Sequence, residues 1–184
     1  MVFGFKGKKD IKSEVDVGIP LSKLKPVEGL RHMDWGAPAP LILASEHKLS
    51  IAYYLESEGD WDGEITRLRN PKADIDEMAV FYVTGLSSFS QRVTSQPDHL
   101  CPFFNYSLNE YPPNEYPSHG VWKVEGPLKQ STLENQFAFP KDIRLIFSFH
   151  DTAIDCFCSK FEYEVIVSSG ANVLEKMGSF IFPE

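Results

Sequence analysis

Apolar and polar residues alternate most regularly in the segment 143–169, IRLIFSFHDTAIDCFCSKFEYEVIVSS. An apolar side chain at nearly every second position is the period of a β-strand with one buried face. The segment divides into two such runs, 143–150 and 153–169, joined at Asp151 and Thr152. It therefore predicts a β-hairpin, the strongest strand pair in the chain.

The side-chain pattern also predicts the register of this hairpin. An even-length turn centred on Asp151 and Thr152 places Phe149 opposite Ile154 and Ser148 opposite Asp155. One face is then apolar throughout, with Leu145, Phe147, Phe149, Ile154, Cys156 and Cys158. The other face carries Ile146, Ser148, His150, Ala153, Asp155 and Phe157. An odd-length turn would place Asp155 among the phenylalanines, and burial of an unpaired carboxylate is costly. Both cysteines are therefore expected to face the core.

Other runs predict further strands. LILASEHKLSIAYYLE (41–56) reads as a hairpin with a three-residue turn at 46–48. This turn would place on one face Leu41, Leu43, Leu49, Ile51, Tyr53 and Leu55. MAVFYVTGL (78–86) reads as a buried strand, with SSFSQRVTS (87–95) as its partner across a break at Gly85 and Leu86. After Ser159 the apolar residues move from even to odd positions, which predicts a bulge or bend near Ser159 and Lys160.

The two ends of the chain show different patterns. Residues 1–34 have scattered prolines and no regular period, so we expect an irregular N-terminal arm before a single β-rich domain at 35–184. Helical spacing of Val173, Leu174, Met177 and Phe180 predicts a short C-terminal helix. The expected fold is mainly β, an antiparallel β-sandwich or open barrel of about eight strands with that helix.

Composition narrows the class of protein. The 184 residues are 42% hydrophobic, enough for one globular domain, and the formal net charge is -8. This charge opposes binding to nucleic acid and to anionic membranes. The N-terminus lacks a secretory signal pattern, and no apolar run approaches the roughly 18 residues of a membrane span. With only three cysteines, the chain is expected to be cytoplasmic.

The segment 96–120, QPDHLCPFFNYSLNEYPPNEYPSHG, contains five prolines and cannot form a regular element. A loop of this length usually either covers one end of a core or binds something. Its Tyr106, Tyr111 and Tyr116 could supply contact area and hydrogen bonds, together with Trp122 just after it. These four residues are the predicted surface for a ligand or partner.

Candidate chemistry centres on His150 and Asp155, which share a face in the predicted hairpin. A carboxylate near an imidazole orients it for acid-base work or metal ligation, and His119 is a further candidate from the loop. The alternative is a solvated histidine beside an aspartate that caps its own turn. Cys156 points away from His150 in this register, and a Cys-X-Cys spacing alone is a weak zinc signal, so we predict no metal site.

The pieces SHGVWKVEGP (118–127) and LIFSFHDTAIDCFCSKFEYE (145–164) resemble a group of small bacterial proteins. These proteins have a Phe-His-Asp β-hairpin followed by an acidic residue and Cys. The resemblance covers about a sixth of the chain. It implies a bacterial cytoplasmic origin and no particular activity, so it transfers no site residue.

The sequence thus favours a non-enzymatic cytoplasmic protein that binds a partner protein or small molecule through the Pro/Tyr-rich loop. No Walker loop, Rossmann glycine fingerprint, HExxH or GxSxG motif is present. The alternative is a small-molecule enzyme, with or without a metal, built on His150 and Asp155. A third reading is an inhibitor whose acidic surface attracts a basic partner. Cofactor and oligomeric state are left open.

Overall fold

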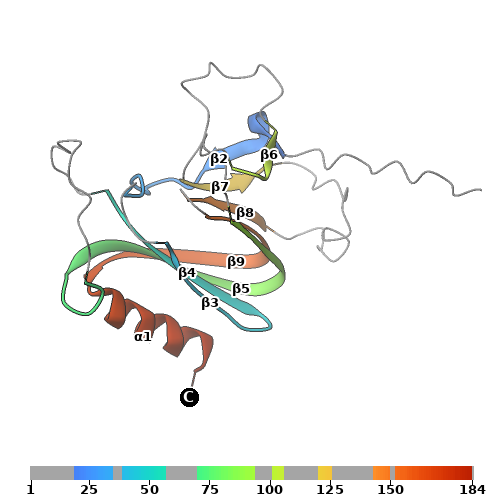
Figure 1. The fold of residues 1–184 in the computed structure, drawn as a ribbon. Coiled ribbons are helices and arrows are strands. Elements are labelled where there is room, and N and C mark those ends of the chain that lie inside the picture. Colours follow the sequence, from blue (N-terminus) through green and yellow to red (C-terminus); the bar gives the residue numbers. More distant parts are fainter. Residues whose placement is uncertain are drawn as a thin grey trace, which may run out of the picture.

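The computed structural model describes residues 19–34, 39–56, 70–93, 101–105, 120–125, 143–149 and 152–183. Seven strands form one antiparallel sheet, in the order β2-β7-β8-β9-β5-β4-β3, and helix α1 (Gly170–Ile181) follows the last strand (Figure 1). The strands are β2 (Leu24–Pro26), β3 (Leu41–Ala44), β4 (Lys48–Tyr54), β5 (Asp76–Val93), β7 (Gly120–Val124), β8 (Ile143–Ser148) and β9 (Thr152–Ser168). The predicted mainly β, antiparallel fold with a C-terminal helix is confirmed.

A long ribbon formed by β5 and β9 organises the sheet. These strands have 18 and 17 residues and pair from Asp76 with Ser168 to Val93 with Thr152. β4 pairs only with the stretch 78–84 of β5, whereas β8 pairs only with the stretch 153–158 of β9. The sheet therefore has two parts. We call the part formed by β3, β4 and the adjoining stretch of the ribbon the α1 half-sheet, and the part formed by β2, β7, β8 and the adjoining stretch of the ribbon the β8 half-sheet. The predicted hairpin at Gly85 and Leu86 is wrong, because β5 continues through this point alongside β9.

The ribbon bends where the two half-sheets meet. Gly85 has φ +62, and a Cβ at this position would overlap Ser159 Oγ. The β5–β9 register shifts between Leu86 and Ser88, and on β9 the inward positions change parity between Cys158 and Phe161. A glycine adopts a positive φ without the steric cost that a Cβ brings. The irregularity predicted near Ser159 and Lys160 is therefore present, with Gly85 facing it.

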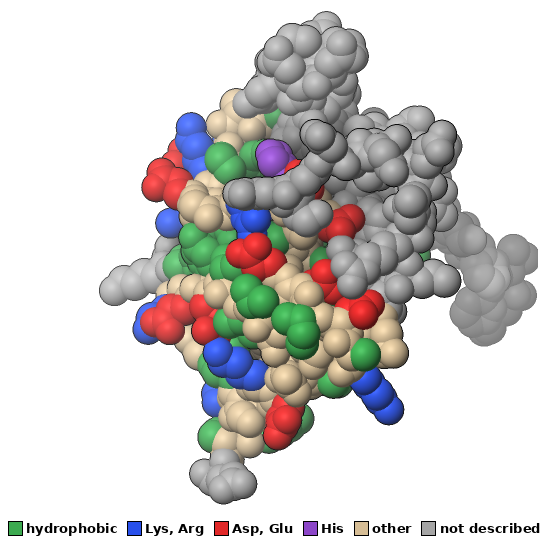
Figure 2. All heavy atoms as spheres, turned by 90° about the vertical axis from the view of Figure 1, so that its left-hand side faces the viewer, with side chains coloured by type: hydrophobic (Ala, Val, Ile, Leu, Met, Phe, Trp, Pro, Cys, Tyr) green, Lys and Arg blue, Asp and Glu red, His purple; other side chains and the backbone are tan. Residues whose placement is uncertain are grey.

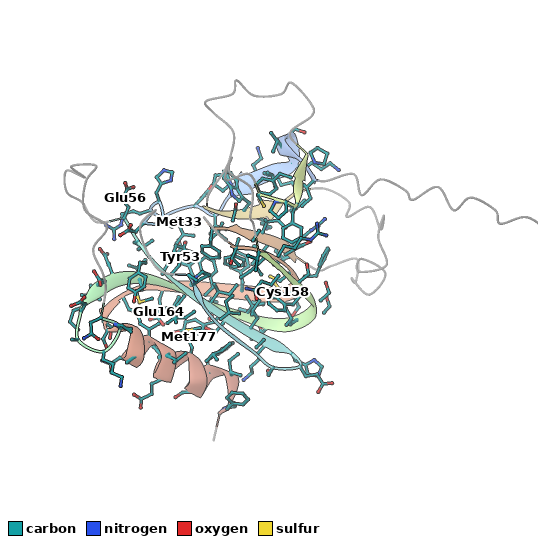
Figure 3. All side chains as sticks on the ribbon, in the orientation of Figure 1. Met33, Tyr53, Glu56, Cys158, Glu164 and Met177 are labelled. Atoms are coloured by element: carbon teal, nitrogen blue, oxygen red, sulfur yellow. The ribbon has the colours of Figure 1, made fainter. Side chains whose placement is uncertain are left out.

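The bend brings the inner faces of the two half-sheets together around one core. The Tyr53 and Phe149 rings have centroids 5.4 Å apart, and those of Phe81 and Phe147 are 5.0 Å apart. Tyr53 lies on β4 and Phe149 just after β8, although β5 and β9 separate these strands in the sheet. Figure 3 shows Tyr53 and Cys158 within this interior. The core includes all six residues predicted for the apolar hairpin face: Leu145, Phe147, Phe149, Ile154, Cys156 and Cys158.

The β3–β4 hairpin differs from its prediction. Ala44 pairs with Leu49, and the Ser45 N–H donates to the Lys48 carbonyl at 2.8 Å, so the turn is one residue shorter than expected. A one-residue change in register moves every side chain of a strand to the other face. Ile42 therefore packs in the inner core. Leu41 and Leu43 instead pack with the residues under α1.

Two separate layers cover the outer face of the sheet. Val173 and Met177 of α1 pack on Met78 and Val80 in the α1 half-sheet, as amphipathic spacing predicts. Over the β8 half-sheet lie β1 (Ile19–Pro20), the 3₁₀ turn η1 (Leu21–Lys23) and β6 (Phe104–Asn105). Residues 19–34, expected in the irregular arm, thus contribute two strands. Their prolines occupy strand ends, where a missing N–H is tolerated.

Candidate functional site

Two of the predicted site residues, Trp122 and Asp155, lie in the described part of the chain and share the outer face of the β8 half-sheet. Trp122 of β7 pairs with Ile146 of β8, which pairs with Asp155 of β9. The other predicted site residues lie outside the described residues: Tyr106, Tyr111, Tyr116, His119 and His150. The site can therefore be built from Trp122, Asp155 and their neighbours.

The hairpin register differs by two residues from the predicted one. Ser148 pairs with Ala153 instead of Asp155, and the Phe149 N–H donates to the Thr152 carbonyl at 2.8 Å. A shift of two preserves which face each side chain occupies, so the two predicted faces are correct although Ser148 opposite Asp155 is wrong. The alternation of apolar residues cannot distinguish registers that differ by two.

Asp155 forms a buried ion pair with Arg144, a residue that the sequence did not single out. Arg144 Nε donates to Oδ1 at 2.9 Å and Nη2 donates to Oδ2 at 2.6 Å. The exposed fractions of the two side chains are 14% and 7%. The guanidinium also lies 4.9 Å from the Phe157 ring centroid. Two charge-assisted bonds join both carboxylate oxygens to Arg144, so Asp155 anchors the guanidinium within the sheet.

Arg144 could have been found from its position. It has the same parity as Ile146 and Ser148, so it lies on the face of Asp155, and a buried carboxylate needs a partner on that face. In the observed register Arg144 is the diagonal neighbour of Asp155. In the predicted register Asp155 lay opposite Ser148, four residues along the strand from Arg144.

Cys101 lies against the same surface and is not activated. Burial raises the pKa of its thiol to about 11, and the nearby Asp155 carboxylate acts in the same direction. Hydrogen bonds from the Phe103 and Phe104 backbone and from Ser148 only partly oppose this rise. A cysteine nucleophile needs a lowered pKa, which allows it to exist as the thiolate at neutral pH. Cys101 is instead a protonated thiol that helps hold the start of β6 to the sheet.

Cys156 and Cys158 lie in the inner core and are fully buried, as predicted. Their mutual hydrogen bond, followed by burial, raises the pKa of the Cys156 thiol well above its ordinary value. Within the described residues, no three histidine, cysteine or acidic side chains gather in a group that could hold a metal ion. In the same part of the chain, no helix has the length and apolar character needed to cross a membrane.

Trp122 presents a buried donor that lacks an acceptor. Its Nε1–H is inaccessible to solvent and has no hydrogen-bond partner in the structure as described. The ring packs edge-on against Phe104 at 6.3 Å. A Cβ at Gly120 would lie 3.5 Å from Nε1, so the donor is next to the residue where the chain re-enters the sheet. An unsatisfied buried N–H costs about 1–3 kcal/mol, and because solvent does not reach this donor, another molecule can contact it only when the residues around it move.

The sheet fixes both ends of the Tyr-rich segment 106–119 on this surface. Before it, Phe104 contacts Trp122 and Phe103 lies 4.7 Å below the Arg92 guanidinium. After it, β7 begins at Gly120. Binding residues often lie on long loops whose ends are held by a rigid sheet. Comparisons of the chain with family models, with curated proteins and with solved structures found no match.

Proposed function

We propose that this protein binds a partner protein or small molecule without catalysing a reaction on it. The binding surface would consist of Trp122 and the segment that carries Tyr106, Tyr111 and Tyr116. The observation that carries the proposal is the buried Trp122 Nε1–H without an acceptor in the described residues. A bound molecule that supplies a carbonyl, carboxylate or hydroxyl oxygen, and whose binding moves the residues around this donor, would satisfy it.

The state of the neighbouring polar groups supports binding over catalysis. Arg144 occupies both oxygens of Asp155, and Cys101 has a raised pKa. An enzyme built on these groups would need a free base or a thiolate. These groups instead stabilise the scaffold from which the Tyr-rich segment extends.

The aromatic residues suggest the form of the recognition. Tyrosine and tryptophan provide a large apolar contact area and one polar group each, at low entropic cost. A binding surface of this kind suits a partner with exposed backbone or carboxyl oxygens. The cytoplasmic location and the absence of nucleic acid and membrane partners are parts of the same proposal, supported by the net charge of -8.

The test uses two variants of the full chain in quantitative affinity capture. The triple change of Tyr106, Tyr111 and Tyr116 to Ala removes aromatic area, and Trp122→Phe removes the donor with the five-membered ring that carries it while keeping one aromatic ring. We expect the triple variant to lose the captured molecule. Trp122→Phe should weaken its binding by about 2- to 10-fold, the value of one hydrogen bond.

Phe182→Ala is the control, because Phe182 is an exposed aromatic, 67% accessible, directly after α1, which packs on the α1 half-sheet and not on the half that carries Trp122. It should leave capture unchanged. Equal capture by wild type and the triple variant would contradict the proposal. So would conversion of the captured small molecule by the wild-type protein and not by Trp122→Phe.

A further inference from the structure

The two layers on the outer face of the sheet are held in different ways. Helix α1 has a polar attachment at each end: the Ala171 N–H donates to the Pro71 carbonyl at 2.9 Å, and Lys48 Nζ donates to the Phe180 carbonyl at 2.8 Å. Figure 2 shows side chains of both charges on the lower part of the molecule, where α1 lies. Together with its apolar face, these bonds fix α1 on the α1 half-sheet.

The segment 101–105, which ends in β6, is held over the β8 half-sheet with fewer bonds. In the described part of the chain, β6 pairs with β1 and with no strand of the large sheet. The segment contacts the sheet through side chains, since Phe104 packs edge-on against Trp122 and the Arg92 guanidinium lies over the Phe103 ring. A two-stranded pair is marginally stable without such packing. This layer is therefore easier to displace than α1.

The closed position of this segment leaves the Trp122 indole N–H without a hydrogen bond. The donor is buried and has no partner in the described residues, and Gly120 lies beside it. Water would supply an acceptor if it could reach the nitrogen. A movement that admits water therefore recovers a hydrogen bond. This gain lowers the free energy of local opening compared with a cover whose polar groups are all satisfied.

We propose that the segment 101–105 is a gate, which opens locally and gives solvent or a bound molecule access to the Trp122 indole N–H. Opening moves Phe104 away from the Trp122 ring, while the large sheet and α1 keep their positions. Local opening of this kind requires less free energy than global unfolding. The identity of the molecule that enters rests on the proposed function, but the movement itself belongs to the free protein.

The test measures exchange of the Trp122 indole N–H with D₂O by NMR on the full chain. Its resonance is assigned by its absence from Trp122→Phe. Phe104→Ala removes the ring that packs on Trp122 and should speed this exchange at least about tenfold, which corresponds to 1.4 kcal/mol. Met177→Ala is the matched control, because Met177 is fully buried under α1 and does not touch the gate. It lowers global stability and should leave the exchange rate unchanged.

A disulfide can lock the gate. Ser148 of β8 is hydrogen-bonded to the Cys101 thiol, so Ser148→Cys places two thiols next to each other across the gate. Oxidation should slow exchange at least about tenfold relative to the same variant in reducing agent. Mass spectrometry identifies the linked pair, since Cys156 and Cys158 are also present. The double variant Cys101→Ser/Ser148→Cys has no such pair and should exchange equally fast in both conditions.

Two results would overturn the proposal. If Phe104→Ala and Met177→Ala both speed exchange by the amount that each lowers global stability, the indole N–H exchanges only through global unfolding. If oxidised Ser148→Cys exchanges as fast as the reduced form, the segment 101–105 does not control access. If the disulfide does not form, the comparison of Phe104→Ala with Met177→Ala still decides. Exchange needs no bound molecule, so a failed capture experiment would count against the proposed function alone.

Discussion

The two halves of β9 belong to one continuous strand but lie in very different surroundings. Every residue from Thr152 to Cys158 is buried, whereas most residues from Ser159 to Ser168 are exposed or half-buried. The first half has a strand on each side and a covering layer on both faces. Among the described residues, the second half has a neighbouring strand, β5, on one side only. Burial in this strand is therefore determined by its neighbours more than by its own residues.

One carboxylate on the outer face of each half shows the consequence of this difference. Asp155 is bound by Arg144, and the exposed fractions of these side chains are 7% and 14%. Glu164 is bound by Lys176, with exposed fractions of 37% and 48%. Water screens the second pair but hardly screens the first. The first pair therefore contributes more to the stability of the fold than the second.

Removal of the buried carboxylate should have the largest effect on stability. Asp155→Ala leaves the Arg144 guanidinium buried and unpaired, and we expect the free energy of unfolding to fall by about 3 kcal/mol. Urea titration measures this change. The double variant Arg144→Met/Asp155→Leu is the control, because it removes both charges and should recover most of the loss. A loss of less than about 1 kcal/mol for Asp155→Ala, typical of an exposed pair, would remove the contrast between the two halves.

The bend between the two halves can be tested with a pair of glycine substitutions. Gly85→Ala should cost about 2 kcal/mol, because its φ of +62 strains an L-residue and the added Cβ meets Ser159. Gly178→Ala is the matched control within α1, where the Cβ would have no neighbour within 4 Å. It should stabilise the protein by roughly 0.5–1 kcal/mol, the difference in helix propensity. Thermal unfolding of both variants measures the change in stability, which should be a loss for Gly85→Ala and a gain for Gly178→Ala. A neutral Gly85→Ala would contradict the account of the bend.

The sequence predicted which residues face inward better than it predicted which residues meet. Alternation placed Cys156, Cys158 and Phe147 in the core, and the change of parity after Ser159 located the bend. Register could not be obtained in the same way, because a shift of two residues preserves the pattern. The pattern around Gly85 was also compatible with two structures, because a glycine within a strand pattern marks either a turn or a bend. It was interpreted as a turn.

The candidate site was less predictable, because it depends on the order of strands in the sheet. Trp122 and Asp155 lie on one surface only because β8 separates β7 from β9. Segments this far apart in the sequence carry no local signal of that order. From the sequence, the cost of burying the Asp155 carboxylate served only to choose which face it occupies. Arg144 could not be identified until the register was known.

The smallest effect is expected at the exposed carboxylate. Hydrogen bonds from Lys176 and then Tyr82 lower the pKa of Glu164 from its ordinary 4.5. The folded protein therefore binds a proton at Glu164 less readily than the unfolded chain. The stabilisation from Glu164 is complete above pH 4.5 and is lost as the pH falls through the lowered pKa. Glu164→Gln should cost only a few tenths of a kcal/mol at pH 7, about 0.5 at most.

The pH dependence of that small difference provides the measurement. Urea titrations of wild type and Glu164→Gln at pH 7, 5 and 3 should give stabilities that approach each other below pH 4.5, because the unfolded wild-type chain then takes up a proton at Glu164 more readily than the folded protein does. Glu175→Gln, the same change on the exposed side of α1, controls for net charge. If Glu164→Gln instead destabilised the protein as much as Asp155→Ala, the two ion pairs would be equivalent. Solvent exposure would then not be what sets the energetic contribution of each ion pair.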